Sequence, residues 1–251
     1  MSPLLLSCIV FAVVACGIFA GMLLERLLPA HHLSDDSKEV IRLGAGLIAT
    51  IIALVLGLLI ASAKSSFEAQ SGQVKQMTAN AILLDRILAK YGDEARGVRE
   101  ELRQSLERVV AQIWSENAAR SSITPFQASV GELTIFEIQA LSPKNDIQRS
   151  LKTWAVDVSA QLAKSRLLLF AQKDNPVPAP FLGVLVFWLT IIFTSYSVFA
   201  PSNATVIVAL FIFAFSASAA IFLILELGQP FMGLLQISPA PLLKALSPLA
   251  S

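Results

Sequence analysis

Apolar residues dominate four stretches of the chain, at 3–24, 43–63, 181–200 and 204–225, and none of the four contains a charged side chain. At 1.5 Å per residue, about twenty helical residues cross the ~30 Å hydrocarbon core of a bilayer. A charge in mid-span would cost on the order of 3 kcal/mol. Its absence from all four stretches is hard to explain in a soluble core, so the pattern predicts four transmembrane helices.

A polar segment separates the second stretch from the third, which gives an arrangement of two spans, a domain and two spans. The predicted fold class is an all-α integral membrane protein with a cytosolic helical bundle inserted between spans 2 and 3. The expected parts are spans 1 and 2 in 1–64, the cytosolic domain in 65–175, spans 3 and 4 in 176–227, and a short, irregular, proline-rich tail in 228–251.

Span 2 is expected to continue beyond the membrane, because no proline interrupts Ile41 to Tyr91. Past Lys64 the apolar positions recur in alternating steps of three and four, the spacing of a heptad seam. The seam consists of Phe67, Gln70, Val74, Met77, Ala81, Leu84, Leu88 and Tyr91. The pattern predicts one helix that extends roughly 40 Å into the cytoplasm. Gln70 is interpreted as a solvated edge position, and Asp85–Arg86 as an exposed or intersubunit ion pair.

Three further helices are expected in the insert. The first follows Gly92 and runs to about Asn117, the second runs from Ser122 to about Leu141, and the third begins at Ser142. Apolar residues at helical spacing define the buried face of the first as Val98, Leu102, Val109 and Ile113. The same reasoning gives the third helix a face of Ile147, Leu151, Trp154, Val158 and Leu162.

Small residues recur at every fourth position of span 2, and this ladder consists of Ala45, Ala49, Ala53, Gly57 and Ala61. Such spacing predicts a shallow groove on one helix face. In lipid a small-residue face lets another helix approach closely. The ladder fits packing within the chain and packing between subunits equally well.

Charge sets the orientation and excludes one class of partner. Lys and Arg number 19 against 18 Asp and Glu, a net charge of +1, so no nucleic-acid partner is expected. The orientation follows from the basic residues near the span ends, which are more numerous in the insert than in the short loops. Those of the insert are Lys64, Lys75, Lys164, Arg166 and Lys173. The domain and both termini are therefore predicted to be cytoplasmic. The first stretch follows no basic region and ends in Glu25-Arg26, which indicates a retained span rather than a signal peptide.

The sequence offers no group of residues typical of catalysis. His31 and His32 are adjacent in a short loop, near Asp35 and Asp36, and are interpreted as solvated rather than metal-binding. Both cysteines lie in span 1, too far apart along one helix to bridge. No nucleotide-binding, hydrolase or zinc motif occurs. Neither a metal nor a cofactor is predicted, and the protein is not expected to be an enzyme.

Three segments resemble a bacterial family of four-span proteins known by its bestrophin-like domain: LGLLIASAKSSFEAQ, ILLDRILAKYG and, late in the chain, LELGQPFMGLLQIS. The order of spans and insert fits as well, and the resemblance implies a bacterial inner membrane protein. Bestrophins are homo-oligomeric anion channels whose second spans surround the pore. The family usually carries an acidic residue where this chain has Gly228, and no acidic calcium clasp is present, so calcium gating is not implied.

The resulting hypothesis is a homo-oligomeric ion channel. Its expected partners are membrane lipid, other copies of the chain, and permeant ions, for which chloride is the candidate. Its pore would be lined by Ile52, Val55 and Leu59, with Lys64 drawing anions to the inner mouth. A second form places the small-residue ladder at the axis instead. The alternative function is a non-conducting scaffold or sensor that transmits motion through the long helix into the cytosolic bundle.

Overall fold

The computed structural model is all-helical in the residues that it describes, which are 2–29, 35–114, 130–172, 179–200 and 203–246. The chain forms two compact units. Unit 1 comprises Met1–Ser66 and Pro176–Gly228, and unit 2 comprises Phe67–Asn175 and Gln229–Ser251. Helix α2 (Asp35–Tyr91) contributes to both.

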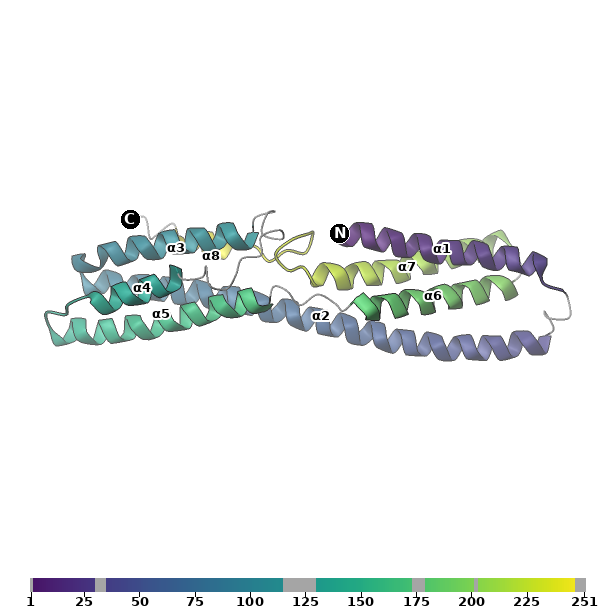
Figure 1. The fold of residues 1–251 in the computed structure, drawn as a ribbon, viewed down its shortest axis with the longest axis horizontal. Coiled ribbons are helices and arrows are strands. Elements are labelled where there is room, and N and C mark those ends of the chain that lie inside the picture. The colour runs from purple at the N-terminus through teal and green to yellow at the C-terminus, as the bar shows by residue number, and fades with distance from the viewer. Residues whose placement is uncertain (1, 30–34, 115–129, 173–178, 201–202, 247–251) are drawn as a thin grey trace. The chain divides into compact units, whose positions relative to one another are not determined.

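Unit 1 contains α1 (Pro3–Leu27), the first part of α2, α6 (Ala179–Phe199) and α7 (Ala204–Leu227). Each of these helices is long and apolar enough to cross a membrane, so the four expected spans are confirmed. Helices α1, α6 and α7 lie side by side (Figure 1). Their shared core includes Val14, Ile18, Leu185 and Ala214.

Glycines on α1 bring its backbone close to α6. A Cβ on Gly21 would lie 2.6 Å from the backbone oxygen of Thr194, so only glycine fits there without movement. Across the same contact, the Thr194 hydroxyl donates to the Gly17 carbonyl at 3.1 Å and the Ser197 hydroxyl donates to the Ile18 carbonyl at 2.7 Å. Small residues and hydroxyl-to-backbone bonds are the usual means of holding helices together in lipid. Helices α1 and α6 are therefore packed with their backbones close together.

The expected extension of span 2 is confirmed, because α2 is one helix of 57 residues. Gly92 ends it with a φ of 121°, a conformation that other residues rarely adopt. A short 3-10 helix, η2 (Asp93–Ala95), then leads into α3 (Arg96–Trp114). The Val98, Leu102, Val109 and Ile113 face of α3 is buried as expected.

Unit 2 also contains α4 (Val130–Ala140), α5 (Asp146–Gln172) and α8 (Ala240–Leu246). Helix α4 packs on α3 and on α5, and α8 packs on α3. The expected start of the α4 helix at Ser122 lies outside the described residues. Helix α5 begins at Asp146, slightly later than expected, with the Asn145 side chain accepting from the Gln148 amide at 2.7 Å.

The buried face expected for α5 is wrong in part. Ile147 is 74% exposed and Trp154 is 50% exposed, whereas Ala155 and Val158 are buried. The helix therefore buries Ala155 and Val158 and leaves two of its largest apolar residues outside. Side-chain size misled the prediction, since the spacing alone fits more than one face.

The C-terminal segment is more ordered than the irregular tail expected from its prolines. It belongs to unit 2 and contributes Phe231, Ile237 and Leu242 to the core of that unit. Helix α8 forms its last described part. Prolines and large apolar residues here form a segment of turns and bends before α8, in which the Ile237 amide donates to the Pro230 carbonyl at 2.7 Å.

Candidate functional site

Helix α2 is the span that the chain itself covers least. In its most apolar stretch 11% of the residues are buried, against 28% in α1, 33% in α6 and 28% in α7. A membrane helix with so little cover of its own is free to contact lipid, another copy of the chain or the contents of a pore. This surface of α2 is the candidate functional site.

The three apolar residues proposed for a pore constriction lie on the covered side of α2. Ile52 is 5% exposed, and Val55 and Leu59 are half-buried against the core of unit 1. They contact the helices of their own chain. Lys64, the fourth residue of that set, is exposed.

The small-residue ladder does not keep to one face of α2, and this expectation is wrong. An α-helix has 3.6 residues per turn, so a step of four residues advances the position by about 40°. Ala45 is accordingly buried and Ala49 half-buried, whereas Ala53, Gly57 and Ala61 are exposed. The ladder begins in the chain's own core and winds onto the uncovered surface of the helix.

That uncovered surface combines small and large residues. A Cβ added to Gly57 would meet nothing within 4 Å. Leu54 and Leu58, on either side of it in sequence, are among the most exposed apolar side chains of the chain. Gly57 therefore leaves open surface near two exposed leucines, with no charged residue between Arg42 and Lys64. Such a surface suits helix packing or an apolar constriction and has no group for acid–base chemistry.

The heptad seam lies inside unit 2. Its members from Gln70 to Tyr91 are buried and Phe67 packs partly buried against the same core. The interpretation of Gln70 as a solvated edge is therefore wrong, since it is 3% exposed. Helices α3, α4 and α5 supply the covering side chains, including Leu102, Ile138 and Val158.

Asp85 forms its ion pair within the chain rather than at an exposed or intersubunit position. Its carboxylate accepts from Nε of Arg99 on α3 at 2.6 Å, and both side chains are largely buried. Its neighbour Arg86 is exposed. The pair fastens α2 to α3, a structural role that the sequence spacing of fourteen residues across a turn did not reveal.

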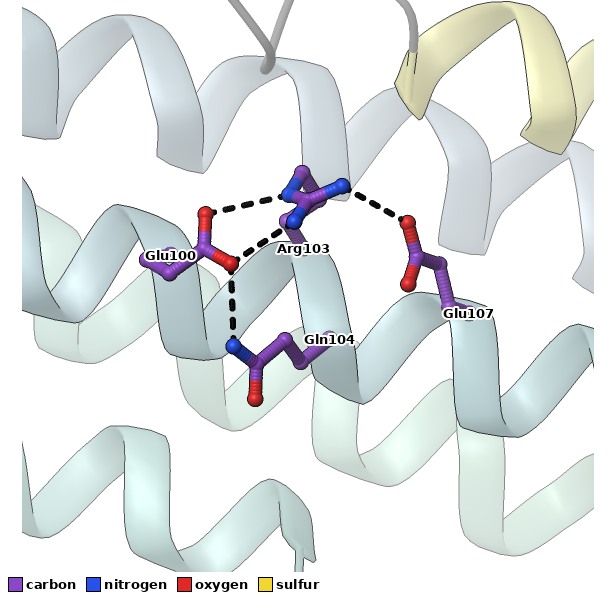
Figure 2. A network of polar contacts seen from close by, with 4 residues as sticks. All are labelled: Glu100, Arg103, Gln104 and Glu107. Carbon is purple, nitrogen blue, oxygen red and sulfur yellow. Dashed lines mark hydrogen bonds and ion pairs between the residues drawn. The ribbon is translucent and has the colours of Figure 1, made fainter.

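Charged residues on the outer side of α3 form a second network (Figure 2). Arg103 donates to Glu100 at 2.7 and 3.0 Å and to Glu107 at 2.9 Å, while Gln104 donates to Glu100 at 2.9 Å. The bonds from Arg103 and Gln104 lower the pKa of Glu100 to about 2. The same carboxylate raises the pKa of Arg103. Every charge here is engaged with its helical neighbours, which stabilises α3 and leaves no reactive group.

No cluster of potential metal ligands occurs among the residues that the structure describes. His31 and His32 lie outside them. Glu226, near the end of α7, is buried. The described part of the chain thus offers packing surfaces and ion pairs.

Four membrane-length helices with a helical bundle between the second and third define an all-helical multi-pass membrane protein. The sequence matches the bestrophin-like domain over residues 10–242. The chain belongs to the bestrophin-like family. A comparison with curated protein sequences finds no match.

Solved structures share this fold. A variant of a bacterial bestrophin homologue from Klebsiella pneumoniae superposes with a TM-score of 0.73 at 16% identity, over 99% of this chain and 97% of the other. A second structure of a Klebsiella homologue gives 0.68 at 16% identity, over 97% and 95%. A structure described as a membrane protein gives 0.64 at 16% identity, over 92% and 97%. At this identity the likeness establishes the fold, and the bestrophin-like membrane fold is confirmed.

Proposed function

We propose that this protein is a homo-oligomeric ion channel of the bacterial inner membrane, selective for anions, in which the α2 helices of several copies surround an axial pore. Bestrophins are anion channels, and the family and fold bring that function to this chain as a hypothesis. The observation that carries it is the sparse cover of α2, the least covered of the four spans.

An oligomer accounts for the uncovered surface of α2 better than lipid alone. Small residues in lipid-facing positions forgo contact, whereas against another helix they allow close van der Waals packing. Ala53, Gly57 and Ala61 are exposed in the single chain, and in an oligomer they would either gain that packing from a neighbouring α2 or face the axis. The leucines beside them would exclude water from the contact or narrow the axis.

Two faces of α2 remain candidates for the pore lining. One carries Ile52, Val55 and Leu59, and the other carries Ala53, Gly57 and Ala61. Burial favours the second, because the first contacts the chain's own core. An apolar ring on either face could gate by dewetting.

The preference for anions rests on the bestrophin relationship and on Lys64. This exposed lysine follows the last apolar residue of the membrane part of α2. Repeated around an axis, it would make a positive ring at one pore mouth. With the insert and both termini in the cytoplasm, as the basic residues favour, the ring would face the cell interior.

Cysteine modification distinguishes the two faces. Cys8 and Cys16 are exposed on α1 and are first replaced by serine to give a silent background. Single cysteines then replace Gly57 or Ile52, and a charged thiol reagent is applied while current is recorded. A change of current with the Gly57→Cys protein and none with Ile52→Cys would support the ladder face, and the reverse would support the other face. If neither protein responds, α2 does not line the pore.

A non-conducting sensor or scaffold is the second candidate, and the continuity of α2 favours it. One uninterrupted helix belongs to both units, so a movement of its membrane part has a direct route into the bundle of unit 2. Sealed oligomers that carry no current, together with a partner bound by unit 2, would support this function over the channel.

A further inference from the structure

A small cavity in unit 2 is lined by residues of α2, α3, α4 and α5. It offers about 20 Å³ to water-sized molecules, and its walls are mostly apolar. Four polar side chains interrupt them: Ser105, Thr134, Ser159 and Arg166. A space of this size holds one or two water molecules and nothing much larger.

Arg166 is an unusual residue to find in this core. Arg166 is 4% exposed. Its Nε and Nη2 atoms are buried and have no hydrogen-bond partner in the described structure. The contact seen for its guanidinium is with the ring of Phe170, at 5.9 Å from the centroid. No salt bridge with Arg166 occurs among the described residues. Buried guanidinium groups are normally paired, because they stay charged and lose their hydration.

The surroundings make the charge of Arg166 harder to accommodate. Burial, and then the nearby positive charge of Arg108, lower the pKa of Arg166. Arg108 is itself engaged with Glu101 at 2.6 Å. The Glu101 carboxylate is thus engaged by Arg108, and no ion pair to Arg166 itself occurs among the described residues.

A second polar group at the cavity is also unpaired. The hydroxyl of Thr134, a residue that is 4% exposed, has no hydrogen-bond partner in the described structure. Ser159 is already engaged, since it donates to the Val156 carbonyl at 2.8 Å. Arg166 Nε, Arg166 Nη2 and the Thr134 hydroxyl are thus buried donors without a partner in the described structure, on two residues that line the cavity.

We propose that this cavity binds a small monovalent anion of the halide class, held by the guanidinium of Arg166 and the hydroxyl of Thr134. Water could accept one of these hydrogen bonds but would leave the charge unbalanced. Sulfate, phosphate and carboxylate ligands are larger than a monatomic halide and fit a small cavity less well. The bound anion joins α5 to α4 at the centre of the bundle, so unit 2 is more stable when halide is present.

This site is separate from the proposed pore and does not depend on ion conduction. It lies in unit 2, at the buried residues Thr134 and Arg166, whereas the pore is proposed on the membrane part of α2. A protein that conducts nothing would still show halide-dependent stability, and a conducting protein could lack it.

Thermal unfolding of the full-length protein in detergent tests the site. Sodium gluconate is replaced stepwise by sodium bromide at constant ionic strength. The wild-type Tm should begin to rise once bromide exceeds Kd and then increase with the logarithm of its concentration, by roughly 5–10 °C at a hundredfold excess over Kd. The Arg166→Met protein should show no bromide-dependent rise, and Thr134→Val should need more bromide for the same rise. Arg86→Met, which removes an exposed arginine, is the matched control and should respond as the wild type does.

Bromide also reports its own position, which protects the test if Arg166→Met fails to fold. Crystals of the wild type grown in sodium bromide should show an anomalous peak between Arg166 and Thr134. A wild-type Tm that ignores bromide, or anomalous peaks only elsewhere, would overturn the proposal and leave water as the occupant.

Discussion

The indole Nε1 of Trp114 donates a 2.7 Å hydrogen bond to the backbone oxygen of Ile237, a residue 123 positions later in the chain. The ring of Trp114 also meets Phe231 edge-on, at 5.4 Å between centroids. The end of α3 thus holds the C-terminal segment in place through one polar and one aromatic contact. Within unit 2 this attachment adds to the packing of α8 on α3 and to the burial of Leu242.

Replacing Trp114 by Phe should therefore loosen the C-terminal segment. Phenylalanine keeps an aromatic contact with Phe231 but leaves the Ile237 carbonyl without its donor, a loss of about 1–3 kcal/mol for a buried acceptor. We expect a lower Tm and faster proteolysis after Gly228. The matched control is Trp154→Phe, because Trp154 is half exposed on α5. Equal behaviour of the two variants would show that the hydrogen bond carries no stability.

The close approach of α1 and α6 predicts the effect of a single methyl group. In the Gly21→Ala protein the new Cβ would lie 2.6 Å from the Thr194 oxygen and 2.7 Å from Cβ of Ser197, so the two helices must separate. We expect a destabilisation of about 1–3 kcal/mol, measured by unfolding in detergent. Gly183→Ala is the control on α6, since its Cβ would meet nothing within 4 Å. That change should be neutral or slightly stabilising. Loss of stability in both variants would indicate a general cost of the substitution instead.

The network around Arg103 makes a prediction about acid. The pKa of Glu100 is about 2 in the folded protein, against an ordinary value of 4.5. A lowered carboxyl pKa stabilises the fold above the ordinary value, and this contribution is lost as the pH falls towards the folded one. The Tm difference between wild type and Glu100→Gln should therefore be largest above pH ~5 and shrink as the pH approaches 2. A difference that does not change over this range would mean that Glu100 is not ionised in the way described.

Much of the fold could be predicted because its determinants are local. Span length, heptad spacing and the absence of proline in α2 are properties of neighbouring residues, and they gave the four spans and the long helix correctly. The buried face of α3 followed from the same periodicity. These patterns reflect burial directly, so they do not need knowledge of distant partners.

What the sequence missed depends on partners far away in the chain. In the sequence Gly17 and Gly21 are ordinary span residues, and only the structure shows that α6 packs against them. The C-terminal prolines suggest an irregular tail, and only the structure shows that this segment binds to Trp114. Arg166 was assigned to orientation by its charge, since only the bundle core shows that it is buried. The ladder failed for a different reason, because a period of four departs from 3.6 by too much to hold one face over five members.

The most direct measurement of the central claim is the current through purified, oligomeric protein in planar bilayers with asymmetric KCl. The account predicts single-channel currents whose reversal potential is displaced from zero towards the equilibrium potential of chloride. Replacing Lys64 by Glu should shift the reversal potential towards the equilibrium potential of potassium. Bilayers that remain silent, although the same preparation is folded and oligomeric, would contradict the channel and favour the sensor or scaffold.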